Sequence, residues 1–237
     1  MPNTIFPSGT QALSAYLAVP EGDGPWPGIV MIHDGLGLNA DLRRQADHMA
    51  ARGYLVLAPD LYSGGNKVGC IAATVRTMAR GKGPALAHIT AAREHLIARP
   101  DCTGKTAVIG FCMGGMFAIM VSTGYGFDAV APNYGMPPPW LEVDDFVRQG
   151  CAPLVGSYGD ADFSIPEHQV QALEKRLTEL DVPHDITVYP ETTHSFFQDN
   201  GGMTGRLFRV AGLRHNPAAC EDAWERIFGF FDEHLAR

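Results

Sequence analysis

The stretch Gly110-Phe111-Cys112-Met113-Gly114-Gly115 decides the fold. It lies between two apolar runs, Ala107-Val108-Ile109 before it and Phe117-Ala118-Ile119-Met120-Val121 after it. The pattern Gly-x-Cys-x-Gly between such runs predicts a nucleophile elbow, in which a strand turns sharply into a helix with Cys112 at the corner. The glycines allow strand and helix to approach closely, and the helix N-terminus favours the thiolate form of the cysteine.

A second interpretation of Cys112 stays open on this motif alone. Free cysteines are often small buried residues with no chemical role. A nucleophilic thiol needs a base within hydrogen-bonding range, and the base needs an acceptor that orients it. The chemical interpretation therefore depends on whether the chain supplies a base and an acceptor downstream of the elbow.

The composition is that of an ordinary globular chain. We expect residues 1–237 to form one large α/β domain, because 237 residues bury a sizeable core but leave little for a second domain. Charged residues make up 19% and the hydrophobic class 46%, which argues against a disordered or fibrous chain. The net charge of −8, without a basic stripe, argues against nucleic acid as a partner.

The N-terminus, the apolar runs and the cysteines together predict a cytoplasmic protein with no membrane partner. Residues 1–7 contain neither a basic segment nor a long apolar core, so we expect no secretory signal. No run approaches the roughly 18 apolar residues of a spanning helix. The five cysteines are scattered and form no CxxC pair, which suits reduced thiols.

Apolar runs alternate with segments of helical spacing along the chain. This alternation predicts βαβ units, and therefore a mostly parallel central sheet with helices on both faces and an antiparallel N-terminal strand or hairpin turning near 7–9. The segment 62–83 has no firm assignment beyond a helical stretch near 71–80. We expect the later strands at 28–33, 54–58, 105–110, 127–134, 152–158 and 184–189, and helices at 39–52, 84–99, 113–123, 166–180 and 217–235.

A candidate triad lies at the strand ends. In parallel sheets the chemistry lies at the carboxyl ends of the strands. Cys112, Asp162 and His194 each come just after a predicted strand, in the order nucleophile, acid, histidine. Spacing alone leaves Asp160 as an alternative acid, and one of the two aspartates is then a turn residue.

Several motifs of the chain form a recognisable set. They are the elbow, Ala58-Pro59-Asp60-Leu61-Tyr62, Asp162 to Pro166, Tyr189-Pro190 ahead of His194-Ser195-Phe196, and Asn216 to Leu235. Together they resemble the motifs of the dienelactone hydrolases, also called carboxymethylenebutenolidases, of the α/β-hydrolase superfamily. The resemblance covers nearly the whole chain and implies the α/β-hydrolase fold. It also implies a Cys-His-Asp triad of Cys112, His194 and Asp162, because the family's acid lies four residues before a proline, here Pro166.

The resemblance further implies an oxyanion hole formed by the backbone N–H groups of Gly35 and Met113. Asp34 stands where the family usually has a glutamate that interacts with the thiol, and its shorter side chain leaves that contact open. Gln198 stands where the family has an arginine that holds a substrate carboxylate, and glutamine lacks the charged fork of arginine. The arginines that would hold a substrate carboxylate in place of the missing family arginine are Arg76, Arg80, Arg206 and Arg209.

The implied activity is hydrolysis of small ester or enol-lactone substrates through a thioester acyl-enzyme, without metal or cofactor. Alternatives are a carboxylesterase or thioesterase acting on other activated acyl groups, and the protein is expected as a monomer or homodimer. Residues near the strand ends are candidates for the substrate pocket, although core packing explains the aromatic ones equally well: Tyr134, Trp140, Phe196 and Phe197.

Two other classes of function fit the motifs of the chain less well: a dinucleotide-binding oxidoreductase, for which there is a partial motif, and a metal-dependent enzyme, for which there is none. Gly35-Leu36-Gly37-Leu38-Asn39-Ala40 fits the G-x-G-x-x-A fingerprint of a dinucleotide-binding oxidoreductase, with Asp60 at the end of the next strand. Asp34 would place a carboxylate against the pyrophosphate, which argues against that interpretation. A metal site is not indicated either, because the chain has no His-Glu-x-x-His and no paired CxxC.

Overall fold

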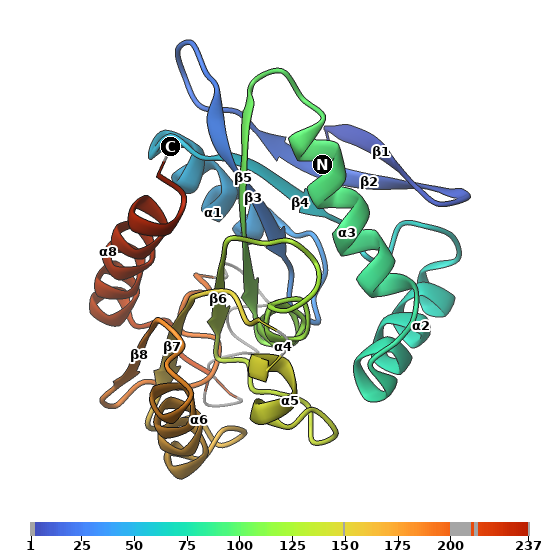
Figure 1. The fold of residues 1–237 in the computed structure, drawn as a ribbon. Helices are drawn as coiled ribbons and strands as arrows, with labels where there is room; N and C mark the ends of the chain where they lie inside the picture. Colours follow the sequence, from blue (N-terminus) through green and yellow to red (C-terminus); the bar gives the residue numbers. More distant parts are fainter. Residues whose placement is uncertain (1–2, 149, 200–209, 211–212, 237) are drawn as a thin grey trace.

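An eight-stranded sheet organises the computed structural model of the chain (Figure 1). The structure describes residues 3–148, 150–199, 210 and 213–236. The strands lie in the order β1-β2-β4-β3-β5-β6-β7-β8, with β1 and β2 antiparallel to their neighbours and the remaining pairs parallel. The predicted α/β fold with an antiparallel N-terminal hairpin is confirmed, whereas the single-domain assignment stays a prediction.

The strand bounds agree closely with the apolar runs. β4, β6 and β7 are buried throughout, as continuous apolar segments require, whereas the edge strand β8 is only partly buried. The eight strands are β1 (Thr4–Ser8), β2 (Gln11–Ala18), β3 (Trp26–Ile32), β4 (Leu55–Pro59), β5 (Cys102–Phe111), β6 (Ala129–Asn133), β7 (Leu154–Gly159) and β8 (His184–Tyr189).

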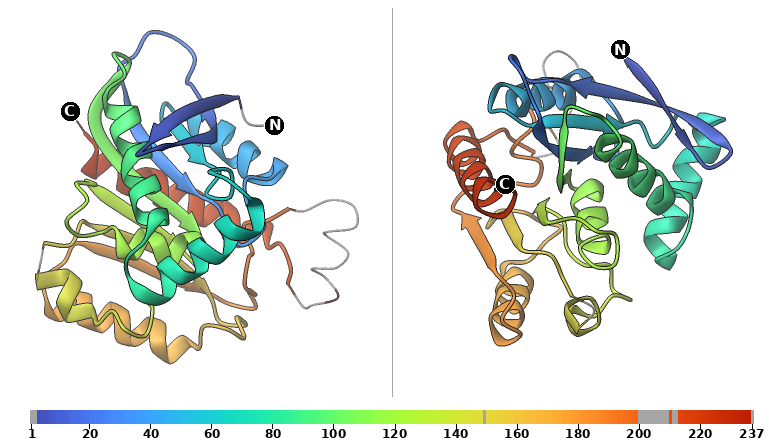
Figure 2. Two further views of the ribbon diagram at one scale, coloured as in Figure 1. Left: turned by 90° about the vertical axis from the view of Figure 1, so that its right-hand side faces the viewer. Right: turned by 45° about the horizontal axis from the view of Figure 1, so that its top comes forward.

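Helices cover both faces of the sheet, and alternate strand residues belong to the two cores. Ile29 and Met31 belong to the core cluster that includes residues of α1 and α8, whereas Val30 and Ile32 belong to the one that includes residues of α3 and α4. Figure 2 shows α8 and α3 on opposite sides of the sheet. The helices are α1 (Ala40–Ala51), α2 (Lys67–Arg80), α3 (Pro84–Ile97), α4 (Met113–Met120), α5 (Val143–Arg148), α6 (Glu167–Glu179) and α8 (Pro217–His234).

The segment 62–83, which has no firm assignment from the sequence, contains α2. Asn66 caps its N-terminus by accepting from the N–H of Gly69, and Gly81 ends it with φ 68°. Its buried residues are the threonines Thr74 and Thr77. Among the described helices, none combines the length and hydropathy needed to cross a bilayer.

The sharp turn after β5 depends on backbone groups in very close approach. Cys112 has φ 54° and ψ −112°, a strained conformation for a residue with a side chain. A Cβ added to Gly114 would lie 2.3 Å from the carbonyl oxygen of Ile32, and one added to Gly110 would lie 2.0 Å from that of Gly114. These contacts press the start of α4 against the ends of β3 and β5.

Substitution of Gly114 by Ala is expected to destabilise the fold by about 3 kcal/mol, because the obstructing atoms are backbone and cannot move aside. Gly229→Ala in α8 is the matched control, since nothing lies within 4 Å of its added Cβ. The control should be neutral or stabilising by up to about 1 kcal/mol. Urea denaturation measures both, and a Gly114→Ala protein as stable as the control would contradict this explanation of the elbow.

Candidate active site

Cys112 lies where β5 turns into α4. Its backbone N–H donates to the carbonyl of Asn133 on β6 (3.0 Å), and its carbonyl accepts from the N–H of Met116 (3.0 Å). The side chain is half-buried and forms no disulfide bond with a described cysteine. The thiol is therefore held at the carboxyl end of the sheet and at the N-terminus of a helix, whose dipole favours negative charge there.

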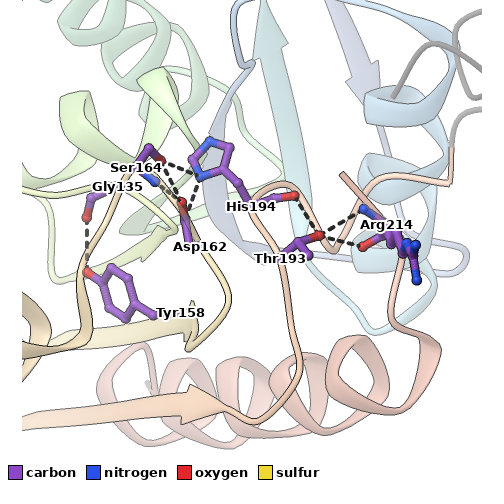
Figure 3. A network of polar contacts seen from close by, with 7 residues as sticks. All are labelled: Gly135, Tyr158, Asp162, Ser164, Thr193, His194 and Arg214. Atoms are coloured by element: carbon purple, nitrogen blue, oxygen red, sulfur yellow. Dashed lines mark hydrogen bonds and ion pairs between the residues drawn. The ribbon is translucent and has the colours of Figure 1, made fainter. Parts of the chain in front are cut away.

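The structure brings His194 and Asp162 together (Figure 3). Nδ1 of His194 lies 2.6 Å from Oδ2 of Asp162, and the two side chains are 12% and 1% exposed. Ser164 completes this group, because its hydroxyl donates to Oδ1 of Asp162 (2.6 Å) and lies 3.2 Å from Nδ1 of His194. Asp162 thus orients the imidazole ring, and the hydrogen bond from Ser164 holds Asp162 in position.

The side chain of Cys112 is near enough to act on the titration of His194. Burial lowers the pKa of His194, but the hydrogen bonds and charges of Asp162 and Cys112 outweigh burial and raise this pKa to about 9. For Asp162, burial raises the pKa, and hydrogen bonds from His194 and Ser164 overcome that effect and lower it. The site therefore favours a protonated imidazole beside an ionised carboxylate.

Asp160, the alternative acid, has a different role. Its Oδ1 accepts from the N–H of Thr192 (3.3 Å), which ties the end of β7 to the loop after β8. Thr193 and Arg214 anchor the same loop through two hydrogen bonds of 2.8 and 3.3 Å (Figure 3). The geometry therefore separates two aspartates that spacing alone could not.

The loop after β3 is held by a buried histidine. Nδ1 of His33 lies 2.6 Å from the carbonyl oxygen of Asp34, and Nε2 lies 3.1 Å from the backbone nitrogen of Leu61. Nδ1 must donate to a carbonyl and Nε2 must accept from an amide, so the ring is neutral. Burial lowers the pKa of His33, which agrees with this tautomer.

Gly35 and Met113 both lie near the hydroxyl group of Tyr62. The phenol of Tyr62 donates to the carbonyl of Gly35 (3.4 Å) and lies 3.8 Å from Sδ of Met113. Neither the N–H of Gly35 nor that of Met113 donates to another described residue. Both donors are thus available to an oxygen atom of a bound substrate.

Asp34 contacts Gln198, not Cys112, among the described residues. Nε2 of Gln198 donates to one oxygen of Asp34, and the N–H of Leu36 donates to the other (2.7 Å). Burial is the largest effect on this carboxyl group and raises its pKa to about 6. Asp34 therefore hydrogen-bonds to the amide of Gln198, whereas the family glutamate at this position interacts with the thiol.

Aromatic residues surround the imidazole. The ring of Tyr134 meets that of His194 edge-on at 5.0 Å, and Phe196 lies 5.5 Å from Tyr134 and 4.8 Å from Phe197. Tyr134 has φ 39°, and its buried hydroxyl has no hydrogen-bond partner among the described residues. All three rings belong to the core cluster that includes residues of α1 and α8, and Tyr134 also contacts the ring of His194 directly.

The other predicted pocket residues lie apart from these contacts. Nε1 of Trp140 donates to the carbonyl of Met78 near the end of α2 (3.0 Å). Arg76 and Arg80 are exposed on α2, and neither forms a hydrogen bond or ion pair with a described residue. Arg206 and Arg209 lie outside the described residues. A pocket role for these side chains stays a prediction.

Two rival interpretations find little support in the geometry. The carboxylate of Asp60 accepts from the N–H of Tyr62 (3.0 Å) in its own loop, so it is engaged where a dinucleotide-binding acid would face a ribose. Within 3–148, 150–199, 210 and 213–236, no group of three or more His, Cys, Asp or Glu side chains is arranged to hold a metal ion.

Sequence reasoning missed three residues that shape the site: His33, Tyr62 and Ser164. His33 and Tyr62 belong to motifs that stand out for other reasons, but nothing in their spacing indicates contacts with Gly35 or Leu61. Ser164 follows Asp162 by two residues, a position from which a serine hydroxyl readily hydrogen-bonds a preceding aspartate. Of the three, Ser164 alone has a local signal.

Comparison with known proteins agrees with the geometry. The sequence profile of the Dienelactone hydrolase family matches residues 13–235. A Yersinia pestis protein with the provisional name carboxymethylenebutenolidase is 26% identical over 246 residues, covering 98% of this chain and 87% of that protein.

Two solved structures extend the comparison. One, from Klebsiella pneumoniae and provisionally named a dienelactone hydrolase, is 25% identical with a TM-score of 0.76, covering 97% of each chain. A dienelactone hydrolase-like promiscuous phosphotriesterase from metagenomic libraries has a TM-score of 0.81 at 22% identity, covering 98% of this chain and 97% of that one. The second likeness shows the fold alone. By the family match, the chain belongs to the dienelactone hydrolase family and is a hydrolase acting on esters or lactones.

Proposed function

We propose that this chain hydrolyses small activated esters, enol lactones or thioesters with Cys112 as nucleophile, His194 as base and acid, and Asp162 as the orienting carboxylate. The observation that carries the proposal is the chain of contacts from Asp162 through His194 to the thiol at the elbow. Family membership supports the hydrolysis of esters or lactones, and the assignment of individual roles rests on this geometry.

In the first half of the reaction, the thiolate of Cys112 attacks the carbonyl carbon and a C–S bond forms. The carbonyl oxygen becomes an oxyanion, which accepts hydrogen bonds from the N–H groups of Gly35 and Met113. The tetrahedral adduct then breaks its C–O bond to the leaving group. The departing alkoxide or enolate takes a proton from the imidazolium of His194, which leaves a thioester on Cys112 and a neutral ring.

In the second half, water attacks the thioester and gives a proton to the neutral His194. The new oxyanion uses the same two N–H groups. Collapse of the adduct breaks the C–S bond, releases the carboxylic acid and restores the thiolate beside the imidazolium. Because a thiolate leaves more readily than an alkoxide, this route suits acyl groups with good leaving groups, and amides should be poor substrates.

Carboxylesterase or thioesterase activity on other small acyl groups is the alternative that the same machinery allows. A cytoplasmic location, a monomeric or homodimeric state and independence of cofactors remain predictions.

Replacement of Cys112 by Ala should abolish hydrolysis of aryl acetates and enol lactones, because no other described group takes the place of the thiolate. Mass spectrometry of the native protein, quenched during turnover, should show the acyl mass on the peptide that contains Cys112. Circular dichroism of the variant controls for folding. Retention of a near-native rate by a folded Cys112→Ala protein would reject the proposal.

Asp162→Asn and Asp160→Asn form a matched pair. The first should lower kcat by about 10³ to 10⁴, because the imidazole loses the partner that holds its tautomer. The second removes a turn contact and should change kcat by no more than about threefold. Steady-state kinetics on one aryl ester compares them, and a larger loss in Asp160→Asn would exchange their roles.

The titration of His194 provides a test of stability. Its folded-state pKa of about 9 exceeds the ordinary value of 6.5, so its stabilising contribution is complete below pH 6.5 and is lost as the pH rises through 9. Asp162→Asn removes the main partner of the charged ring. The difference in free energy of unfolding between native protein and variant should therefore be larger at about pH 6 than at about pH 10. Urea denaturation at both values measures it, and a difference that grows with pH would contradict the assignment.

A further inference from the structure

The hydrogen-bonded pair of Asp34 and Gln198 lies beside the oxyanion donors. Both side chains are buried, with 7% and 8% exposure, and Asp34 directly precedes Gly35. One oxygen of Asp34 accepts from Gln198 and the other from the N–H of Leu36. The carboxylate is thus fixed in place and cannot swing away from an arriving substrate.

Gln198 holds this carboxylate without neutralising it. An amide N–H satisfies one carboxylate oxygen, but it carries no net charge. The ionisable groups that act on Asp34 are Asp41, also negative, and His194, the imidazole of the candidate triad. Its hydrogen bonds come from an amide and a backbone N–H, and no ion pair joins it to a described lysine or arginine. With a pKa of about 6, the group is mostly ionised at pH 7. The positive charge of His194 is already engaged by Asp162 and Cys112.

The remaining surroundings are apolar. Tyr134 meets the imidazole edge-on, and Phe196 and Phe197 pack against Tyr134; all three rings are almost fully buried. Two large apolar side chains adjacent in the chain to site residues are solvent-exposed, Leu36 by 44% and Phe163 by 79%. Exposed apolar side chains beside a site favour contact with apolar parts of a ligand, whereas a carboxylate desolvated there would need a cation or several hydrogen-bond donors.

We propose that the Asp34–Gln198 pair selects uncharged acyl substrates and disfavours those that carry a carboxylate close to the scissile bond. The inference rests on the proposed function, because it concerns the substrate of the same site. Repulsion between Asp34 and a substrate carboxylate raises the energy of both bound ground state and transition state. The effect therefore falls on kcat/KM.

Two isosteric esters test the proposal: meta-acetoxybenzamide, which is neutral, and meta-acetoxybenzoate, which is anionic. The native protein should cleave the neutral ester with a kcat/KM about tenfold higher or more. Gln198→Arg adds a cation that pairs with Asp34 and faces the substrate, so it should reduce this ratio by about tenfold. Gln198→Leu, which adds no charge, is the control and should not reduce it.

Asp34→Asn tests the same proposal should the arginine variant fail to fold. It removes the negative charge at almost constant volume, so it should also reduce the ratio of kcat/KM for the neutral ester to kcat/KM for the anionic ester. Thermal unfolding checks each variant. Equal kcat/KM for the two esters in native protein, with both activities lost in Cys112→Ala, would overturn the selectivity and leave the proposed function intact. Cleavage of neither ester, or undiminished cleavage by Cys112→Ala, would overturn both.

Discussion

The structure depends on the close approach of backbone atoms at the elbow. Gly110 and Gly114 leave no room for a Cβ between β5, α4 and the end of β3, and a Cβ on Gly115 would lie 2.8 Å from the carbonyl oxygen of Asn133 on β6. Three strand ends and one helix therefore meet within van der Waals distance. As a result, the thiol of Cys112 and the N–H of Gly35 lie at one edge of the sheet, although 77 residues separate them in the chain.

The imidazole must reach this edge from the far side of the sheet, because β6 and β7 separate β5 from β8. Two residues with positive φ flank it, Glu191 at 51° and Ser195 at 63°, and they redirect the loop after β8. Tyr134, at the end of the intervening β6, fills the space and supports the ring. Strained backbone is tolerated here because the hydrogen bonds of Thr193 and Asp162 hold the loop on both sides.

Much of this arrangement could be predicted from the sequence, and the reason is local. Apolar runs such as 28–33 identify buried strands, Asn39 and Asn216 cap helices through their own side chains, and parallel topology gathers strand ends without any knowledge of contacts. The strand order, with β4 outside β3, and the start of α2 at Lys67, four residues before the expected helical stretch, could not be predicted in this way. The neutral His33 and the buried pair of Ser8 and His88 (2.8 Å) depend on residues 28 and 80 positions away.

The hydrogen bond between Asp34 and Gln198 could not be predicted from the sequence, for a different reason. A motif can show that a family arginine is replaced by Gln198, but not whether the remaining carboxylate finds another cation, turns to solvent or reaches the thiol. The structure shows a fourth outcome, in which the amide itself becomes the partner. A buried carboxylate with a neutral partner retains its charge at the cost of desolvation, as the raised pKa of Asp34 shows. Since such a group destabilises the folded chain at neutral pH, its position directly before Gly35, one of the proposed oxyanion donors, agrees with the proposed role in substrate selection better than with a role in stability.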